Sequence, residues 1–169
     1  LFGGAMDNKV AQTLAKTLNE LGYIAVRPNF RGVGQTAGAH DHGVAETEDM
    51  LVVLAWMRAE LPVPVDAPLV LAGFSFGSFV QSRVAAALQA RGEAVSRMIM
   101  VGTAAGKWEV APVPSDSIVI HGELDDTIPL GAVMRWAEPL ELPVTVVAGA
   151  DHFFHRRLHL IKQIIVQQW

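Results

Sequence analysis

Short apolar runs alternate with longer segments of helical periodicity along this chain. The runs are rich in Val and Ile, and those over residues 23–30, 69–74, 97–102, 117–121 and 143–148 predict five strands. The periodic segments predict helices over residues 8–21, 46–60, 76–91, 130–140 and 159–169. Strands that are apolar throughout and alternate with helices indicate an α/β fold, with a mostly parallel sheet covered by helices on both faces.

Composition narrows the classes of partner. The chain has 169 residues with no interdomain linker and no repeat, so residues 1–169 are interpreted as one domain. A formal net charge of −4 argues against a nucleic-acid partner, and no apolar run is long enough to span a bilayer. The absence of cysteine excludes disulfides, thiolate metal sites and a cysteine nucleophile. A cytoplasmic location is the default expectation, and the composition carries no signal for the oligomeric state.

The sequence Gly73-Phe74-Ser75-Phe76-Gly77 has the G-x-S-x-G pattern. It stands between a predicted buried strand and a predicted helix, which is the setting of a nucleophile elbow. In such an elbow the serine occupies a sharp, strained turn, and small flanking residues let the strand and the helix approach each other. We therefore expect the Ser75 hydroxyl to be the nucleophile and the Phe76 N–H to form part of the oxyanion hole.

A serine nucleophile requires a base, and the base requires a carboxylate that orients it. Asp125 lies in the loop after the strand predicted over residues 117–121, and His152 follows the last predicted strand. The carboxyl ends of parallel strands meet at one edge of a sheet, where ligand sites of α/β proteins collect. The sequence therefore predicts that Ser75, Asp125 and His152 come together as a catalytic triad.

Each of these two partners has rivals close by in the chain. Glu123 and Asp126 flank Asp125 and are interpreted as a turn residue and a helix cap. His155 and His159 lie on the way into the terminal helix, where an exposed helical histidine is the simpler interpretation.

Two further patterns imitate cofactor and metal sites. Residues 32–37 match G-x-G-x-x-A after a predicted strand, but no amphipathic helix continues from them, so dinucleotide binding is not expected. His40 and His42 flank Asp41 without a third ligand at helical spacing, and a hydrogen-bonded loop is the simpler interpretation. We therefore expect neither a cofactor nor a metal.

The chain resembles the small lidless bacterial α/β-hydrolases, a group similar to dienelactone hydrolases and carboxylesterases. The resemblance is carried by the segments GGAMDNKV, NFRGVGQTAG, LAGFSFGSFV, HGELDDTIP and GADHFFHRRL. It implies a serine hydrolase with a triad of Ser75, Asp125 and His152 and with no cofactor. It also implies a sheet of about eight strands, so we expect the chain to be truncated at its N-terminus. The second oxyanion donor would then lie at Leu1–Phe2 or just upstream.

The function expected from these observations is hydrolysis of a carboxylic ester or thioester of a small molecule, through an acyl-enzyme intermediate. Either Phe76 or Phe153 is a candidate for lining an acyl pocket, and Trp108 is a candidate substrate contact. Three alternatives stay open. In the first, the same triad hydrolyses amide or peptide bonds or transfers an acyl group to an alcohol. In the second, the scaffold is a binding protein without catalytic activity. In the third, the chain is a fragment without activity of its own.

Overall fold

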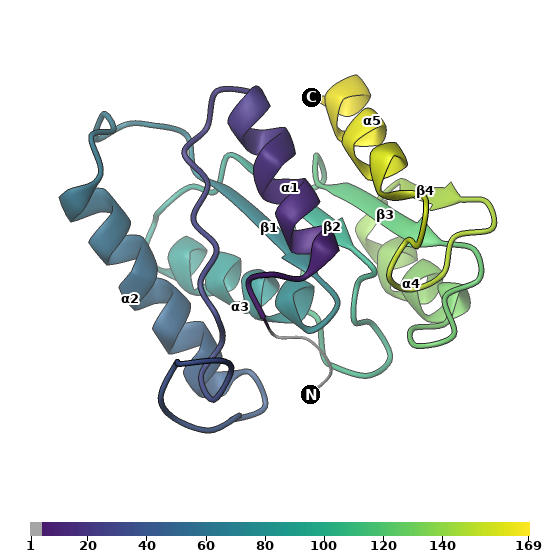
Figure 1. Ribbon diagram of the computed structural model, residues 1–169, viewed down its shortest axis with the longest axis horizontal. Coiled ribbons are helices and arrows are strands. Elements are labelled where there is room, and N and C mark those ends of the chain that lie inside the picture. The colour runs from purple at the N-terminus through teal and green to yellow at the C-terminus, as the bar shows by residue number, and fades with distance from the viewer. Residues whose placement is uncertain (1–4) are drawn as a thin grey trace.

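The computed structural model describes residues 5–169 as a four-stranded parallel sheet with helices on both faces (Figure 1). The strands are hydrogen-bonded in the order β1-β2-β3-β4. In the described part of the chain, no helix has the length and apolar character needed to cross a membrane. The strands are β1 (Val70–Phe74), β2 (Arg97–Val101), β3 (Ile118–Gly122) and β4 (Val144–Val147), and the helices are α1 (Lys9–Glu20), α2 (Val44–Glu60), α3 (Phe76–Ala90), α4 (Leu130–Ala137) and α5 (Leu158–Gln168).

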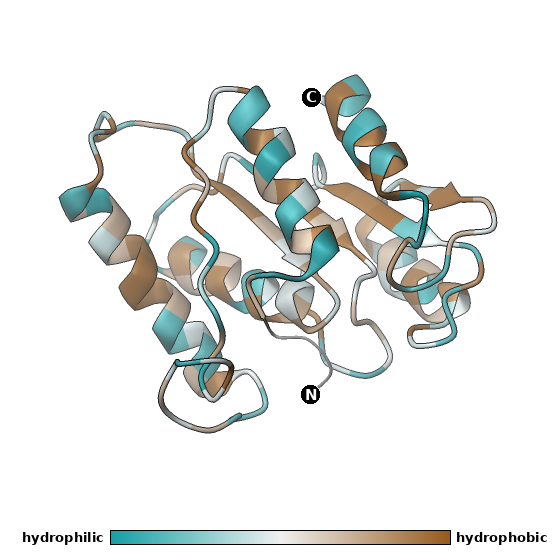
Figure 2. Ribbon diagram, in the orientation of Figure 1, coloured by the Kyte–Doolittle hydropathy of each residue, from teal (hydrophilic) through white to brown (hydrophobic). Residues whose placement is uncertain are grey.

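The sheet separates two hydrophobic layers. Met98 and Met100 of β2 pack toward α2, α3 and α4, whereas Ile99 and Val101 pack toward α1 and α5. All four side chains are fully buried, and burial of each contributes about 1.5–3 kcal/mol. Because both faces are covered, the strands are mainly apolar, as the largely brown arrows of Figure 2 show.

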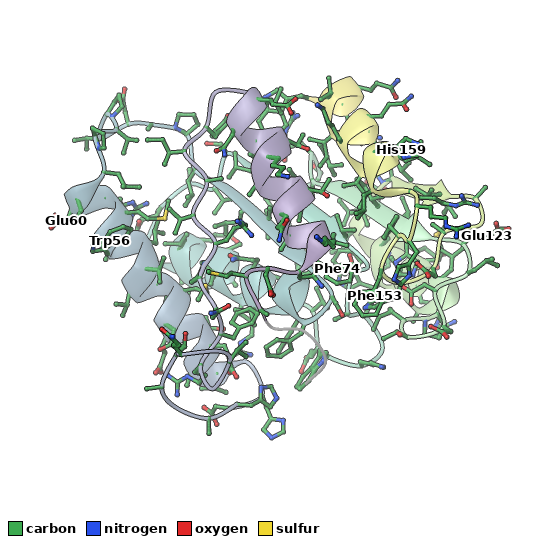
Figure 3. All side chains as sticks on the ribbon, viewed as in Figure 1. Trp56, Glu60, Phe74, Glu123, Phe153 and His159 are labelled. Atoms are coloured by element: carbon green, nitrogen blue, oxygen red, sulfur yellow. The ribbon has the colours of Figure 1, made fainter. Side chains whose placement is uncertain are left out.

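The outer surface of α2 belongs to neither layer. Trp56 projects from this helix toward solvent, as does Glu60 at its end (Figure 3). Half of the Trp56 surface (51%) is exposed. This side chain therefore contributes little to the core, although it is one of the larger apolar groups in the chain.

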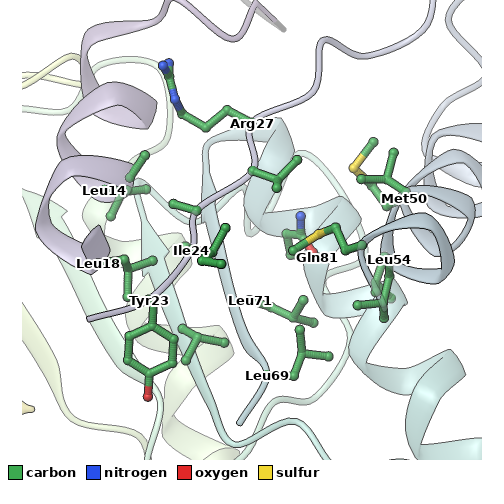
Figure 4. Close-up of a pocket in the computed structure, with 18 of the residues that line it drawn as sticks. Leu14, Leu18, Tyr23, Ile24, Arg27, Met50, Leu54, Leu69, Leu71 and Gln81 are labelled. Atoms are coloured by element: carbon green, nitrogen blue, oxygen red, sulfur yellow. The ribbon is translucent and has the colours of Figure 1, made fainter. Parts of the chain in front are cut away.

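Four of the five predicted strands are confirmed, but the prediction of a strand over residues 23–30 is wrong. This segment is extended, yet it pairs with no strand in the described part of the chain. A largely apolar cavity of about 1020 Å³, bordered by Ile24, Leu54 and Leu71, lies between this segment and β1 (Figure 4). A strand is stabilised by ladder hydrogen bonds to a neighbour, and this segment makes none to β1, from which the cavity separates it.

Helix ends differ from the predictions by a few residues for local reasons. The helix predicted over residues 130–140 gives way after Ala137 to a short 3₁₀ turn, Glu138–Leu140. Pro139 lacks an N–H and does not continue the α-helical hydrogen bonds. The last helix, α5, differs from its prediction by one residue at each end and lies beside α1 on one face of the sheet (Figure 1).

Helix α2 begins two residues before the predicted start because a buried carboxylate caps it. The Glu46 side chain is fully buried. Its Oε2 accepts the N–H of Gly43 at 2.8 Å, and its Oε1 accepts the N–H of Asp41 at 2.9 Å and Nδ1 of His40 at 2.8 Å. Burial by itself raises the pKa of Glu46, but the hydrogen bonds from these backbone groups and from His40 outweigh it and lower the pKa.

Replacement of Glu46 by Gln is expected to lower the free energy of unfolding by about 1.5–3 kcal/mol near neutral pH, because hydrogen bonds to a charged acceptor are worth that much. The pKa of Glu46 is lowered in the folded state, so its stabilisation is complete above the pKa of the unfolded chain and is lost as the pH falls through the folded value. The difference between wild type and variant should therefore shrink below about pH 4, which urea unfolding at a series of pH values measures.

The matched control is Glu48→Gln, which removes an exposed carboxylate of the same helix. It is expected to change the free energy of unfolding by less than about 0.5 kcal/mol. A destabilisation of the Glu46 variant that stays the same in acid would show that the carboxylate charge is not the cause.

Candidate active site

Ser75 stands at a strained turn between β1 and α3. Its backbone has φ +53° and ψ −124°, a conformation that non-glycine residues rarely adopt. The turn is held by the Ser75 N–H, which donates to the Val101 carbonyl at 3.0 Å, and by the Ser78 hydroxyl, which donates to the Ser75 carbonyl at 2.6 Å. The G-x-S-x-G pattern thus has the strand, sharp turn and helix that define a nucleophile elbow.

The three side chains singled out in the sequence meet at the carboxyl ends of β1, β3 and β4. Nε2 of His152 lies 2.9 Å from Oγ of Ser75, and Nδ1 of His152 lies 2.7 Å from Oδ2 of Asp125. His152 is 4% exposed and Asp125 is 6% exposed. An imidazole between a hydroxyl and a buried carboxylate can take a proton from the hydroxyl as the carboxylate stabilises the resulting cation.

Backbone groups fix the orientation of Asp125. Its Oδ1 accepts the N–H groups of Thr127 at 2.9 Å and of Ile128 at 2.7 Å, which leaves Oδ2 for His152. Burial alone raises the pKa of Asp125, but the hydrogen bonds from His152 and from the Ile128 N–H outweigh it and hold the pKa below the usual value. The carboxylate is therefore charged at neutral pH and acts only as an acceptor.

Close contact between two loops brings Asp125 and His152 together. The Leu124 N–H donates to the Ala150 carbonyl at 2.9 Å. At Gly122 an added Cβ would lie 2.5 Å from that same carbonyl oxygen, so a larger residue would push the two loops apart. The glycine at the end of β3 thus permits the approach on which the hydrogen bond between the two side chains depends.

The rival side chains have other partners. Glu123 is exposed, and its Oε2 accepts the Gly149 N–H at 2.8 Å. Asp126 and His159 are exposed, and neither has a hydrogen bond to His152. His155 pairs with Asp151 at 2.5 Å on the surface. Among the described residues, Asp125 is the carboxylate that faces His152.

Sequence reasoning missed His121, a fully buried residue of β3 behind Asp125. Its Nε2 lies 2.9 Å from the Ile128 carbonyl, to which it donates, and 3.5 Å from Oδ2 of Asp125. Burial lowers the pKa of His121, so the ring is neutral and presents its Nε2–H to both oxygens. A polar residue within the apolar run SIVIHG was the available signal.

The two sequence patterns that imitate cofactor and metal sites both lie in the loop before α2. Residues 32–37 do not begin a helix. Arg31 braces this loop through two hydrogen bonds of 2.8 Å to Asp49. The His40 ring is hydrogen-bonded to the Glu46 carboxylate. His42 is exposed, and its ring centroid lies 4.8 Å from that of His40.

Aromatic rings flank the serine on both sides. The Phe74 ring lies 4.9 Å from the His152 ring and 5.8 Å from Phe153, and Figure 3 shows Phe74 and Phe153 close together. Phe76, the first residue of α3, follows the serine, and its N–H is one of the helix-terminal donors that have no partner within the helix. The second oxyanion donor, predicted at Leu1–Phe2 or just upstream, lies outside the described residues.

Comparison with known proteins gives consistent results. The thioesterase-domain family matches residues 10–117. An uncharacterized protein of Rickettsia prowazekii is 30% identical over 167 residues, and the match covers 91% of this chain and 68% of that protein. The chain is similar to a solved α/β serine hydrolase without a lid from Xanthomonas campestris, with 40% identity, a TM-score of 0.86 and coverage of 99% of this chain and 75% of that chain. A solved α/β serine hydrolase homologue from Coxiella burnetii is 35% identical, with a TM-score of 0.79 and coverage of 96% and 77%.

Proposed function

Since the chain belongs to the thioesterase-domain family and has the α/β-hydrolase fold, we propose that it cleaves a carboxylic ester or thioester through an acyl-enzyme intermediate on Ser75. The family match and the similar serine hydrolases identify the chain as a hydrolase that acts on ester bonds. The proposal adds the residues that perform the reaction, which are Ser75 as nucleophile, His152 as base and Asp125 as the orienting carboxylate.

In the proposed first step, Oγ of Ser75 attacks the carbonyl carbon of the substrate and passes its proton to Nε2 of His152. The C–O double bond opens to an oxyanion, toward which the Phe76 N–H donates. One such donor is typically worth about 3–4 kcal/mol of activation free energy. The oxyanion then collapses, the bond to the alcohol or thiol breaks, and His152 returns the proton to the leaving group.

In the second step water replaces the serine as the attacking group. His152 takes a proton from water, the hydroxide adds to the acyl carbon, and the bond to Ser75 breaks as the serine oxygen regains its proton. Asp125 keeps Nδ1 of His152 protonated throughout, so that Nε2 is free to accept and return protons. The products are a carboxylic acid and the regenerated enzyme.

One observation carries the proposal. The continuous pair of hydrogen bonds from Ser75 through His152 to Asp125, at 2.9 and 2.7 Å, is within the range in which a base can remove the proton of a nucleophile. The strained elbow supports the same interpretation, because such a backbone persists only where the surrounding structure holds it.

Labelling with a fluorophosphonate probe tests the nucleophile directly. The wild-type chain is expected to gain the mass of one phosphonyl adduct, and Ser75→Ala is expected to gain none, because only an activated serine displaces fluoride from such a probe. Intact-mass spectrometry measures the adduct. Ser96→Ala, which removes an exposed serine just before β2, is the matched control and should label as the wild type does.

Two results would overturn the proposal. One is a folded wild-type chain that gains no adduct, and the other is an adduct that persists in Ser75→Ala. Circular dichroism of both proteins shows whether they are folded, so that a loss of label is not confused with a loss of structure.

A further inference from the structure

Four aromatic rings form a continuous surface on one side of Ser75. They come from three separate parts of the chain, namely the loop before α2, the first residue of α3 and the loop after β2. Neighbouring ring centroids are 4.8–6.0 Å apart. This surface, called the aromatic wall here, consists of His40, His42, Phe76 and Trp108.

Contacts from behind hold the aromatic wall in place. The Trp108 ring stacks on Phe79, which is 4% exposed, with centroids 5.1 Å apart and an interplanar angle of 18°. Phe76 packs edge-on against Phe30 at 5.3 Å. His40 is fixed by its hydrogen bond to the buried carboxylate of Glu46. Because these rings are already ordered, they lose less conformational entropy when a ligand binds.

The aromatic wall and His152 lie on opposite sides of Ser75. Phe76, which follows the serine, packs with the core layer of α2 and α3, whereas Phe74, which precedes it, packs with the other layer and contacts His152. In the proposed reaction His152 gives a proton to the leaving group, so the alcohol or thiol departs on the His152 side. An acyl substituent directed away from His152 would then meet the wall.

We propose that the aromatic wall is the acyl subsite and that it selects substrates whose acyl group carries an aromatic ring. This inference rests on the proposed function, because it concerns the same serine. Offset or edge-on contacts between aromatic rings contribute about 0.5–1.5 kcal/mol beyond the burial of apolar area. A saturated ring of the same outline is apolar but lacks this contribution.

A pair of matched thioesters tests the preference. The N-acetylcysteamine thioesters of phenylacetic and cyclohexylacetic acid share a leaving group without an aromatic ring and differ only in the acyl ring. The wild type is expected to hydrolyse the phenylacetyl substrate with a kcat/KM about three- to tenfold higher. Release of the thiol, followed with a disulfide reagent, measures both rates.

Variants of the wall should remove this preference. Trp108→Leu is expected to bring the ratio of the two kcat/KM values to about one, since it deletes the central ring. Trp56→Leu, which replaces the exposed tryptophan on α2, is the matched control and should leave the ratio unchanged. If Trp108→Leu does not fold, His42→Leu removes an exposed ring at the edge of the wall and should lower the ratio without loss of the core contact to Phe79.

The outcomes separate this inference from the proposed function. Hydrolysis of both thioesters with a phenylacetyl to cyclohexylacetyl ratio of kcat/KM of one or less would overturn the aromatic preference and leave the nucleophile in place. A ratio that no wall variant changes would also overturn it. Failure to hydrolyse any of the thioesters, with no fluorophosphonate adduct, would instead overturn the proposed function.

Discussion

Replacement of Asp125 by Asn is expected to lower kcat about ten-thousand-fold while the fold stays intact. Oδ1 of Asp125 accepts the N–H groups of Thr127 and Ile128, so the amide oxygen of the new side chain would keep that place. The amide NH₂ would then occupy the position of Oδ2 and donate to Nδ1 of His152. The imidazole would carry its proton on Nε2, where it can no longer accept the proton of Ser75.

Steady-state kinetics on a small activated ester measures this loss. Asp126→Asn is the matched control, because it makes the same change in the exposed neighbouring carboxylate and should alter kcat less than about twofold. Thermal unfolding of both variants shows whether the fold is kept. An Asp125→Asn enzyme within tenfold of the wild type would show that this carboxylate does not orient the base.

Replacement of Gly73 by Ala is expected to lower activity at least about a hundredfold and to destabilise the fold by roughly 3 kcal/mol or more. A Cβ at this position would lie 2.5 Å from the carbonyl oxygen of Gly77 and 2.6 Å from Cα of Ser78. Both are backbone atoms of the first turn of α3, so no side chain can rotate away. The helix must move, and Ser75 moves with it out of reach of His152.

The second glycine of the motif is the matched control. At Gly77 an added Cβ would meet only the Phe30 ring at 4.0 Å, an ordinary van der Waals contact. Gly77→Ala is expected to keep the fold and to raise the free energy of unfolding by about 0.5–1 kcal/mol, because alanine favours a helix more than glycine does. Urea unfolding and kcat/KM of the two variants measure the contrast, and equal effects of both substitutions would contradict it.

Local pattern was sufficient to predict most of the elements. The central strands β2 and β3 are buried on both faces, and such strands carry a signal that depends on composition rather than on partners. The elbow at Ser75 was also predictable, because the small residues that a strained turn requires stand at every second position of a five-residue segment. The approximate ends of most helices followed from the same periodicity.

Residues 23–30 show where local pattern is insufficient. The segment has the composition of a strand, but strand formation requires a neighbour, and no part of the local sequence specifies one. The start of α2 is a second example. The sequence predicts Glu46 as the first residue of a helix, whereas its buried carboxylate binds groups of the preceding loop and the helix begins two residues earlier, at Val44.

The sequence by itself determined the order of the elements and the presence of a serine, a carboxylate and a histidine at the ends of three strands. Only the tertiary structure decided which histidine contacts the serine and which carboxylate contacts that histidine. Asp125 and His152 are 27 residues apart, and Ser75 and His152 are 77 apart. Hydrogen bonds over such separations depend on how strands pair and loops pack, and a difference of one residue turns a side chain from the site toward solvent, as at Asp126.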